Sequence, residues 1–228
     1  MNALTLAHEH TVATLEAYER WAPAYPAFAH NPLMRAEEVA MRAHWPEVTG
    51  RTALDLACGT GRYAKLLVES HAAQVVALDF SSAMLGQVLI GARVCASMMR
   101  LPFAADAFAA VTCGLALGHA TDLHPWMIEI ARVLEPGGVL LYSDFHPEAA
   151  QAGLTRSFKD ASGRKRTLPH CCYSVAAQEL SVAAAGLTLE AIAEVRVGIE
   201  LQESFAGCEE FYDRWHGVPL VLIVRARS

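Results

Sequence analysis

Apolar and polar residues alternate along the chain in a pattern that predicts strands separated by helices. Short apolar runs, each with the length of a buried strand, occupy residues 52–57, 73–79, 92–96, 107–113 and 139–145. Between them, apolar residues recur at helical spacing, for example over residues 81–90 and 123–134. Near-continuous apolar strands are typical of sheets covered on both faces. The pattern therefore predicts an α/β fold in which helices connect parallel strands.

Both ends of the chain depart from this alternation. Residues 1–48 have the helical period at 4–20 and 33–44 with prolines between, which predicts a helical segment outside the sheet. Near the other end, a helical pattern at 175–185 precedes strand patterns at 187–197 and 218–225. Because no proper crossover helix separates these two strands, we expect an antiparallel pair at the edge of the sheet.

Residues 148–173 interrupt the alternation after the fifth strand. Arg156-Ser157-Phe158 and Arg164-Lys165-Arg166 flank the polar stretch Asp160-Ala161-Ser162-Gly163, a pattern typical of a hairpin. Two interpretations stay open, because such an insertion can shape a substrate pocket or lie as a solvated hairpin on the surface.

Composition and charge narrow the possible functions. The chain has 228 residues, 54% of them hydrophobic, and a net charge of −6, with no basic cluster longer than Arg164–Arg166. This favours a small-molecule or carrier-bound substrate over nucleic acid. No apolar run reaches the length of a membrane span and no signal-peptide pattern begins the chain, so we expect a cytoplasmic protein. Neither the six cysteines nor the scattered histidines have the spacing of metal ligands.

The stretch between the first strand and its helix carries the most specific chemistry. In Asp55-Leu56-Ala57-Cys58-Gly59-Thr60-Gly61, the two glycines allow a tight turn that a ligand can approach closely. The spacing Gly59-x-Gly61-x-x-Ala64 also fits a loose dinucleotide fingerprint. Asp55, however, suits a ligand that carries an ammonium group better than a pyrophosphate.

These residues resemble motif I of the class I S-adenosylmethionine-dependent methyltransferases, in which an acidic residue precedes a G-x-G turn. The block Arg132-Val-Leu-x-Pro136-Gly-Gly-x-Leu-Leu141 resembles a later landmark of that family, so the resemblance extends over residues 52–147. It implies a Rossmann-like seven-stranded methyltransferase sheet with an antiparallel C-terminal strand, a helical N-terminal cap and a hairpin insertion after strand five. It also implies S-adenosyl-L-methionine as the cofactor.

One domain over residues 1–228 is expected, with three parts. Residues 1–48 form the helical cap, 49–147 the cofactor-binding half, and 148–228 the substrate-side insertion and C-terminal strands. The chain is long and apolar enough for one α/β domain with a sizeable core.

Asp79 ends the second strand, eighteen residues beyond Gly61, where α/β nucleotide folds hold a ribose. A carboxylate there can accept hydrogen bonds from both ribose hydroxyls, although capping of the next helix is an alternative. Ser97 stands where the family commonly has an aspartate at the adenine, and a hydroxyl is a weaker acceptor. Tyr18 and Tyr25 resemble residues of a cap over the cofactor, or else merely pack on the domain. The cofactor-binding residues implied are Tyr18, Tyr25, Asp55, Ala57, Gly59, Gly61, Asp79, Phe80, Met84, Ser97, Met98 and Leu115.

Two histidines are candidates for a general base. His146 follows the fifth strand at the predicted crevice edge, and His119 lies in the loop after the fourth strand. His119 could equally pack or cap a helix. The resemblance implies transfer of a methyl group to an O, N or C atom of a small-molecule or carrier-bound metabolite, as in ubiquinone/menaquinone and malonyl-carrier-protein methyltransferases. A catalytically silent protein of this fold and an NAD-dependent reductase are the alternatives, and the acceptor and oligomeric state stay open.

Overall fold

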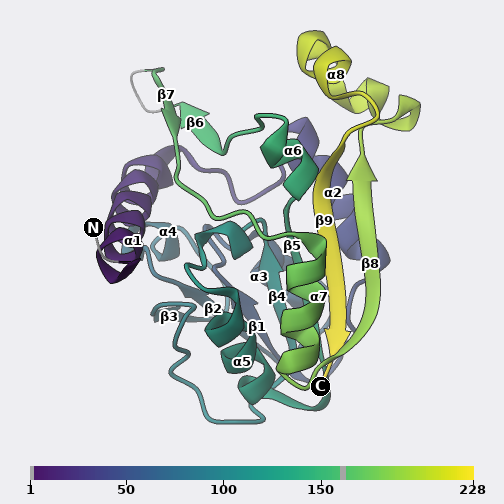
Figure 1. Ribbon diagram of the computed structural model, residues 1–228. Coiled ribbons are helices and arrows are strands. Elements are labelled where there is room, and N and C mark those ends of the chain that lie inside the picture. The colour runs from purple at the N-terminus through teal and green to yellow at the C-terminus, as the bar shows by residue number, and fades with distance from the viewer. Residues whose placement is uncertain (1–2, 160–162) are drawn as a thin grey trace.

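The computed structural model describes residues 3–159 and 163–228. Within them, seven strands form one mixed sheet in the order β3-β2-β1-β4-β5-β9-β8 (Figure 1). The strands of this sheet are β1 (Thr52–Leu56), β2 (Gln74–Asp79), β3 (Ala92–Cys95), β4 (Phe108–Gly114), β5 (Leu134–Phe145), β8 (Thr188–Arg196) and β9 (Pro219–Arg227). The predicted α/β class and seven-stranded sheet are confirmed.

The central strands are parallel and buried on both faces. β1 lies between β2 and β4, with Leu54 opposite Val76 on one side and Val111 on the other. Leu54 and Val111 are fully buried, as the near-continuous apolar runs predicted. β5 pairs antiparallel with β9, which pairs antiparallel with β8, so the predicted antiparallel edge is confirmed as well.

Helices cover both faces of the sheet (Figure 1). One face carries α5 (Leu123–Val133) and α7 (Val175–Ala184), which bury a core that includes Trp126 and Tyr142. The Tyr142 hydroxyl donates to Gln178 of α7 at 2.9 Å, which satisfies this buried polar group. The opposite face carries α2 (Pro32–Ala43) and α3 (Arg62–Glu69).

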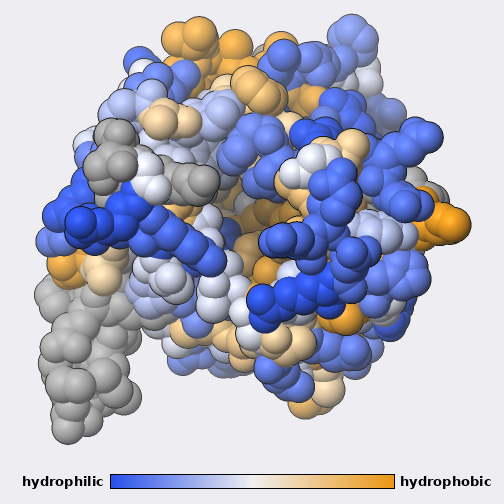
Figure 2. Space-filling view, turned by 90° about the horizontal axis from the view of Figure 1, so that it is seen from above, coloured by the Kyte–Doolittle hydropathy of each residue, from blue (hydrophilic) through white to orange (hydrophobic). Residues whose placement is uncertain are grey.

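The remaining elements gather at the carboxyl ends of the parallel strands, the upper end in Figure 1. They are α1 (Ala3–Trp21), η1 (Ala22–Ala24), α4 (Ser82–Leu85), η2 (Leu117–His119), α6 (Pro147–Gln151), β6 (Ser157–Lys159), β7 (Lys165–Thr167), η3 (Ile199–Phe205) and α8 (Glu209–Trp215). Seen from above in Figure 2, this end is hollowed, with apolar residues inside and mostly polar residues around the rim. The additions therefore surround the edge where ligands bind in open α/β sheets.

Two predicted elements, the helix over 81–90 and the strand over 139–145, differ from the structure by four or more residues at one end. The helix expected over 81–90 is only the short α4, because Gly86 ends it and Gly91 adopts a φ of +74° close to the Val75 carbonyl. β5 begins at Leu134, directly after α5, rather than at Val139. Pro136 and Gly137 lie inside β5, where a register shift opposite β4 accommodates them.

The inserted hairpin is present as β6 and β7, with Phe158 opposite Arg166. Residues 160–162 of its expected turn lie outside the described residues. Phe158 is buried and stacks on Trp21 of α1 with ring centroids 4.5 Å apart, so one face of the hairpin packs against the N-terminal segment. In the part of the chain that the structure describes, no helix is long and apolar enough to cross a membrane. The organisation as one domain stays a prediction.

Candidate active site

A cavity of about 410 Å³ opens at the carboxyl ends of the parallel strands. We call the lining residues at the ends of β1, β2 and β3 the first compartment of this cavity. We call those after β4 and β5, together with the lining residues of α1 and Tyr25, its second compartment. The first contains most of the predicted cofactor residues: Asp55, Ala57, Gly59, Asp79, Phe80, Met84, Ser97 and Met98. The second contains Leu115 and His119, joined by Tyr18 and Tyr25 from the N-terminal segment. Of the predicted site residues, Gly61 and His146 do not line it.

The turn after β1 has an unusual backbone. Gly59 has a φ of +55°, and a Cβ added there would meet nothing within 4 Å. Ala57 also adopts a left-handed φ of +53°, which is uncommon for a residue with a side chain. The turn is closed by hydrogen bonds from Cys58 N to Leu78 O and from Gly61 N to Cys58 O, each 2.9 Å. The backbone at Gly59 therefore faces the cavity directly.

Gly61 supports this turn from behind. It precedes α3 with a φ of +89°, and a Cβ there would approach the Val88 side chain at 3.2 Å. Only glycine adopts this conformation readily. Its contribution is to the shape of the turn, and a direct cofactor contact stays a prediction.

Asp55 joins the end of β1 to the start of α3. Its carboxylate is 1% exposed and accepts a hydrogen bond of 2.7 Å from Ala64 N in the first turn of α3. Such a bond satisfies one of the unpaired amide groups at a helix start. Burial raises the pKa of Asp55 to about 7, although the Ala64 amide and Arg62 oppose this rise.

Asp79 ties the turn to the end of β2. Its Oδ2 accepts from Gly59 N at 2.8 Å, and its Oδ1 accepts from Ser81 N at 2.9 Å. Ser81, rather than Asp79, caps α4 by accepting from Met84 N. Burial raises the pKa of Asp79 to about 6, while the amide groups of Ser81, Gly59 and Phe80 oppose this rise. Asp79 therefore holds the turn and lines the cavity at once.

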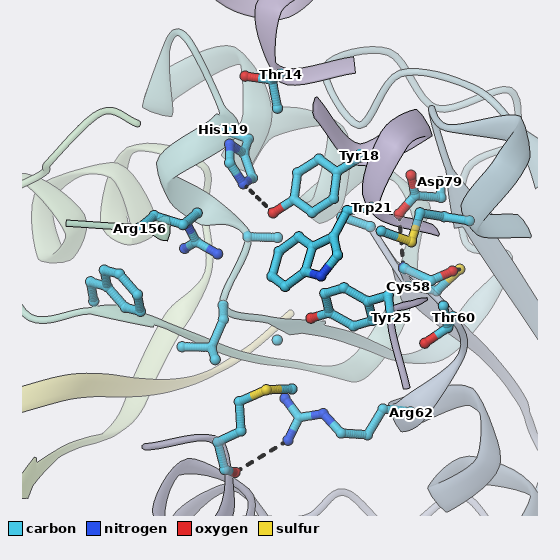
Figure 3. Close-up of a pocket in the computed structure, with 18 of the residues that line it drawn as sticks. Thr14, Tyr18, Trp21, Tyr25, Cys58, Thr60, Arg62, Asp79, His119 and Arg156 are labelled. Carbon is cyan, nitrogen blue, oxygen red and sulfur yellow. Dashed lines mark hydrogen bonds between the residues drawn. The ribbon is translucent and has the colours of Figure 1, made fainter. Parts of the chain in front are cut away.

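Three aromatic side chains of the N-terminal segment enter the cavity (Figure 3). Trp21 lies between Tyr18 and Tyr25, with ring centroids 6.0 and 4.5 Å away. The Tyr18 hydroxyl is 2.9 Å from His119 Nε2. Helix α1, which contains Tyr18 and Trp21, is held to α4 by Glu19. The Glu19 carboxylate accepts from Ser81 Oγ at 2.8 Å and from Ala83 N at 3.3 Å. α1 therefore forms a wall of the cavity and does not merely pack on the outside.

A buried ionic network holds α2 against the sheet. Glu37 is fully buried, forms an ion pair with Arg62 at 2.7 Å and accepts from the Tyr63 hydroxyl at 2.6 Å. Ser143 of β5 also donates to Glu37, and its Oγ accepts from Leu115 N at 2.9 Å. Leu115, with a φ of +54°, lines the cavity. The network thus connects the N-terminal segment to the strained loop after β4.

The two candidate bases occupy different environments. His146 is 1% exposed and caps α6, because its Nδ1 accepts from Glu148 N at 3.2 Å. Its Nε2 lies 3.4 Å from Glu194 Oε1. His119 lines the cavity beside Tyr18. Geometry therefore favours His119 over His146 for proton transfer to or from a ligand.

Arg156 is the main cavity residue that sequence reasoning missed. It precedes β6, lines the second compartment and pairs through Nη2 with Asp144 Oδ1 at 2.9 Å. A single arginine before a hairpin gives no sign in the sequence that it is buried. Among the described residues, no group of three or more His, Cys, Asp and Glu side chains could hold a metal ion.

Comparison with known proteins agrees with this geometry. Residues 54–142 match the family model described as a methyltransferase domain. The chain is 42% identical over 101 residues to the demethylmenaquinone methyltransferase of Corynebacterium urealyticum, a match that covers 42% of each chain. It is 35% identical over 144 residues to the malonyl-[acyl-carrier protein] O-methyltransferase of Halorhodospira halophila, covering 60% of this chain and 46% of that one. The matches thus span less than half the length of these two relatives.

A solved structure shows the same fold. An S-adenosylmethionine-dependent methyltransferase from Mesorhizobium loti superposes with a TM-score of 0.69 at 24% identity, covering 85% of this chain and 98% of that one. This likeness extends beyond the matched residues 54–142, because it covers 85% of this chain. The resemblance predicted from the sequence is therefore confirmed: residues 54–142 match a methyltransferase domain, and the chain has the fold of a solved S-adenosylmethionine-dependent methyltransferase.

Proposed function

We propose that this protein is an S-adenosylmethionine-dependent methyltransferase that methylates an O, N or C atom of a small-molecule or carrier-bound metabolite. The proposal rests on one observation: the two compartments belong to one continuous cavity. A polar cradle around Gly59 and Asp79 opens directly into an aromatic compartment around Tyr18 and Trp21. One cavity can thus hold a donor and an acceptor side by side, which is the requirement for direct group transfer.

The residues of the first compartment fit S-adenosylmethionine. Asp55 and Asp79 supply buried carboxylates for a ligand that carries a positive charge and vicinal hydroxyls. Phe80, Met84 and Met98 supply apolar surface suited to an aromatic base. Gly59 leaves open space where a side chain would stand. When bound, this cofactor supplies a methyl group on a sulfonium centre, which is electrophilic without help from the protein.

The chain's own contribution to catalysis is then alignment and water exclusion. Trp21 and Tyr25 cover the cavity from the N-terminal side, and Leu115 forms part of its wall. If the acceptor must lose a proton, His119 Nε2 is placed to receive it through the Tyr18 hydroxyl, with which it shares a hydrogen bond. Burial raises the pKa of Tyr18, so its hydroxyl stays protonated and able to relay a proton.

The antiparallel β8–β9 edge favours this function over an NAD-dependent reductase, since dinucleotide dehydrogenases generally lack it. The cytoplasmic location and the absence of a nucleic-acid partner stay predictions.

An acceptor screen tests the proposal. The protein is incubated with S-adenosylmethionine and quinols, phenols, amines, carboxylic acids or carrier-bound acids, and the demethylated cofactor is measured by mass spectrometry. We expect stoichiometric formation of demethylated cofactor and of an acceptor heavier by one methylene unit with at least one class. The Gly59→Val variant, whose side chain would enter the cavity, serves as the inactive control. Cofactor binding without turnover in every class would favour the catalytically silent alternative.

A further inference from the structure

Arg156 is a cationic side chain buried inside the second compartment. It is 8% exposed, although arginine is rarely buried unless it is paired. Its position is fixed by the backbone, because Arg156 O accepts from Leu168 N at 2.9 Å across the base of the hairpin. Figure 3 shows Arg156 on the opposite side of the cavity from Asp79, near His119 and Tyr18. Its guanidinium points into the cavity.

The partners of this guanidinium leave part of it without a hydrogen bond. Nη2 donates to Asp144 at 2.9 Å, the Tyr18 hydroxyl is a second hydrogen-bond partner of the guanidinium, and the ring of Phe145 lies 4.6 Å from Cζ, across one face. Nε is buried and has no hydrogen-bond partner among the described residues. Arginine carries five N–H donors, and a buried donor without an acceptor is costly. Asp144 itself does not line the cavity, so the carboxylate holds the guanidinium from behind.

The other arginine of the cavity is bound differently. Arg62 forms ion pairs with Glu37 at 2.7 Å and Glu38 at 3.5 Å, and also lies 3.4 Å from Met34 O. Arg62 therefore pairs with two carboxylates, whereas Arg156 pairs with one, that of Asp144, among the described residues. The planar fork of arginine matches a carboxylate, which it can bind through two parallel hydrogen bonds. Of the two arginines, Arg156 is the one with capacity for an anion.

We propose that Arg156 binds a carboxylate of the methyl acceptor, so that the substrates are acids with an apolar or aromatic body. This inference rests on the proposed methyltransferase function. The body of such an acid would pack on the apolar side chains that share the compartment with Arg156, namely Trp21, Leu154, Phe205 and Phe211. Asp144 and Phe145 are positioning residues that hold the guanidinium in place.

Calorimetric titration with matched acids and amides tests this inference. The probes are benzoate and benzamide, 2-naphthoate and 2-naphthamide, and hexanoate and hexanamide, each titrated into protein saturated with the demethylated cofactor. We expect at least one acid to bind roughly tenfold or more tightly than its amide, as hydrogen bonds between charged groups predict. In Arg156→Gln this preference should disappear while cofactor affinity is unchanged. Arg42→Gln, which alters an exposed arginine paired with Glu38, should keep it.

A second variant separates recognition from folding. Arg156→Gln leaves Asp144 buried without its partner, so the double variant Asp144→Asn/Arg156→Gln replaces the ion pair by a neutral pair of similar shape. It should also bind acid and amide equally. Equal binding of acid and amide by the unmodified protein, no binding of any acid, or an acid preference that survives in the double variant would overturn the inference. If the unmodified protein did not bind the demethylated cofactor, the result would instead count against the methyltransferase function itself.

Discussion

At the scale of single residues, Asp79 supports the turn after β1 and lines the cavity, whereas the helix-capping role considered for it from the sequence belongs to Ser81. Its carboxylate accepts from the amide groups of Gly59 and Ser81 and also lines the cavity. Each carboxylate oxygen has two acceptor sites, so bonds to the backbone leave capacity for ligand hydroxyls. Structural support and ligand binding are therefore compatible at this position.

We predict that Asp79→Asn weakens binding of S-adenosylmethionine about tenfold or more, because hydrogen bonds to a charged group contribute about 1.5–3 kcal/mol each. Calorimetric titration measures this loss. Asp122→Asn is the matched control, since Asp122 caps α5 outside the cavity and asparagine caps a helix equally well. If Asp79→Asn bound the cofactor as tightly as the control, Asp79 would have no place in the ribose site.

The same residue predicts how stability depends on pH. The pKa of Asp79 is raised to about 6 in the folded protein, above about 3.9 for an unperturbed aspartate. The folded state therefore binds the proton more tightly. Its stabilising contribution is complete below about pH 4 and is lost as pH rises through about 6. Relative to Asp79→Asn, the unmodified protein should lose about 2–3 kcal/mol of unfolding free energy between pH 4 and 7. Urea titrations at several pH values measure this difference, and a pH-independent difference would contradict it.

At the scale of elements, the turn between β1 and α3 contributes both to the stability of the fold and to cofactor binding, and the two contributions can be measured separately. Gly59 and Gly137 have φ values of +55° and +79°, and an added Cβ meets nothing within 4 Å at either. Only Gly59 lines the cavity. Alanine at either position should cost about 1–2 kcal/mol of unfolding free energy, because both adopt left-handed backbone.

Cofactor binding should distinguish these two variants. Gly59→Ala is expected to weaken binding because its methyl group enters the cavity, and Gly137→Ala is expected to leave affinity unchanged. Thermal melting combined with calorimetric titration separates the two effects. Equal affinity in both variants would show that Gly59 does not contact the cofactor.

The attachment of α2 gives a further prediction at this scale. Glu37→Ala leaves Arg62 buried without its closest partner, which should cost about 3–5 kcal/mol of unfolding free energy. Glu38→Ala removes a more exposed carboxylate from the same arginine and should cost about 1 kcal/mol or less. Chemical denaturation measures both values. Similar losses in the two variants would contradict the central role given to Glu37.

The strands and motif I could be predicted because their signals are local. Apolar runs such as Thr52–Leu56 identify buried strands, and adjacent glycines identify the turn. The Glu37 network could not be predicted, because Glu37 meets Ser143 across 106 positions of the sequence. Pro147 directly after His146 is a local sign of a helix start, whereas nothing local shows that His119 lines the cavity.

At the scale of the whole molecule, the sequence predicts the first compartment of the cavity better than the second. The first compartment lies at the ends of neighbouring parallel strands of one sheet. The sheet topology alone therefore brings Asp55 and Asp79 together. The second compartment is lined by residues of α1, of the start of the β6–β7 hairpin and of the region of η3 and α8, which are distant from one another in the sequence. Arg156 belongs to the second compartment, and its place in the cavity could be identified only from the structure.

The measurement that tests the central claim most directly is a calorimetric titration of the purified protein with S-adenosylmethionine, its demethylated product and NAD. We predict saturable one-to-one binding of the first two, in competition with each other, and no binding of NAD. Binding of NAD in place of the methyl donor, or binding of none of the three, would contradict the assignment of this cavity to a methyltransferase.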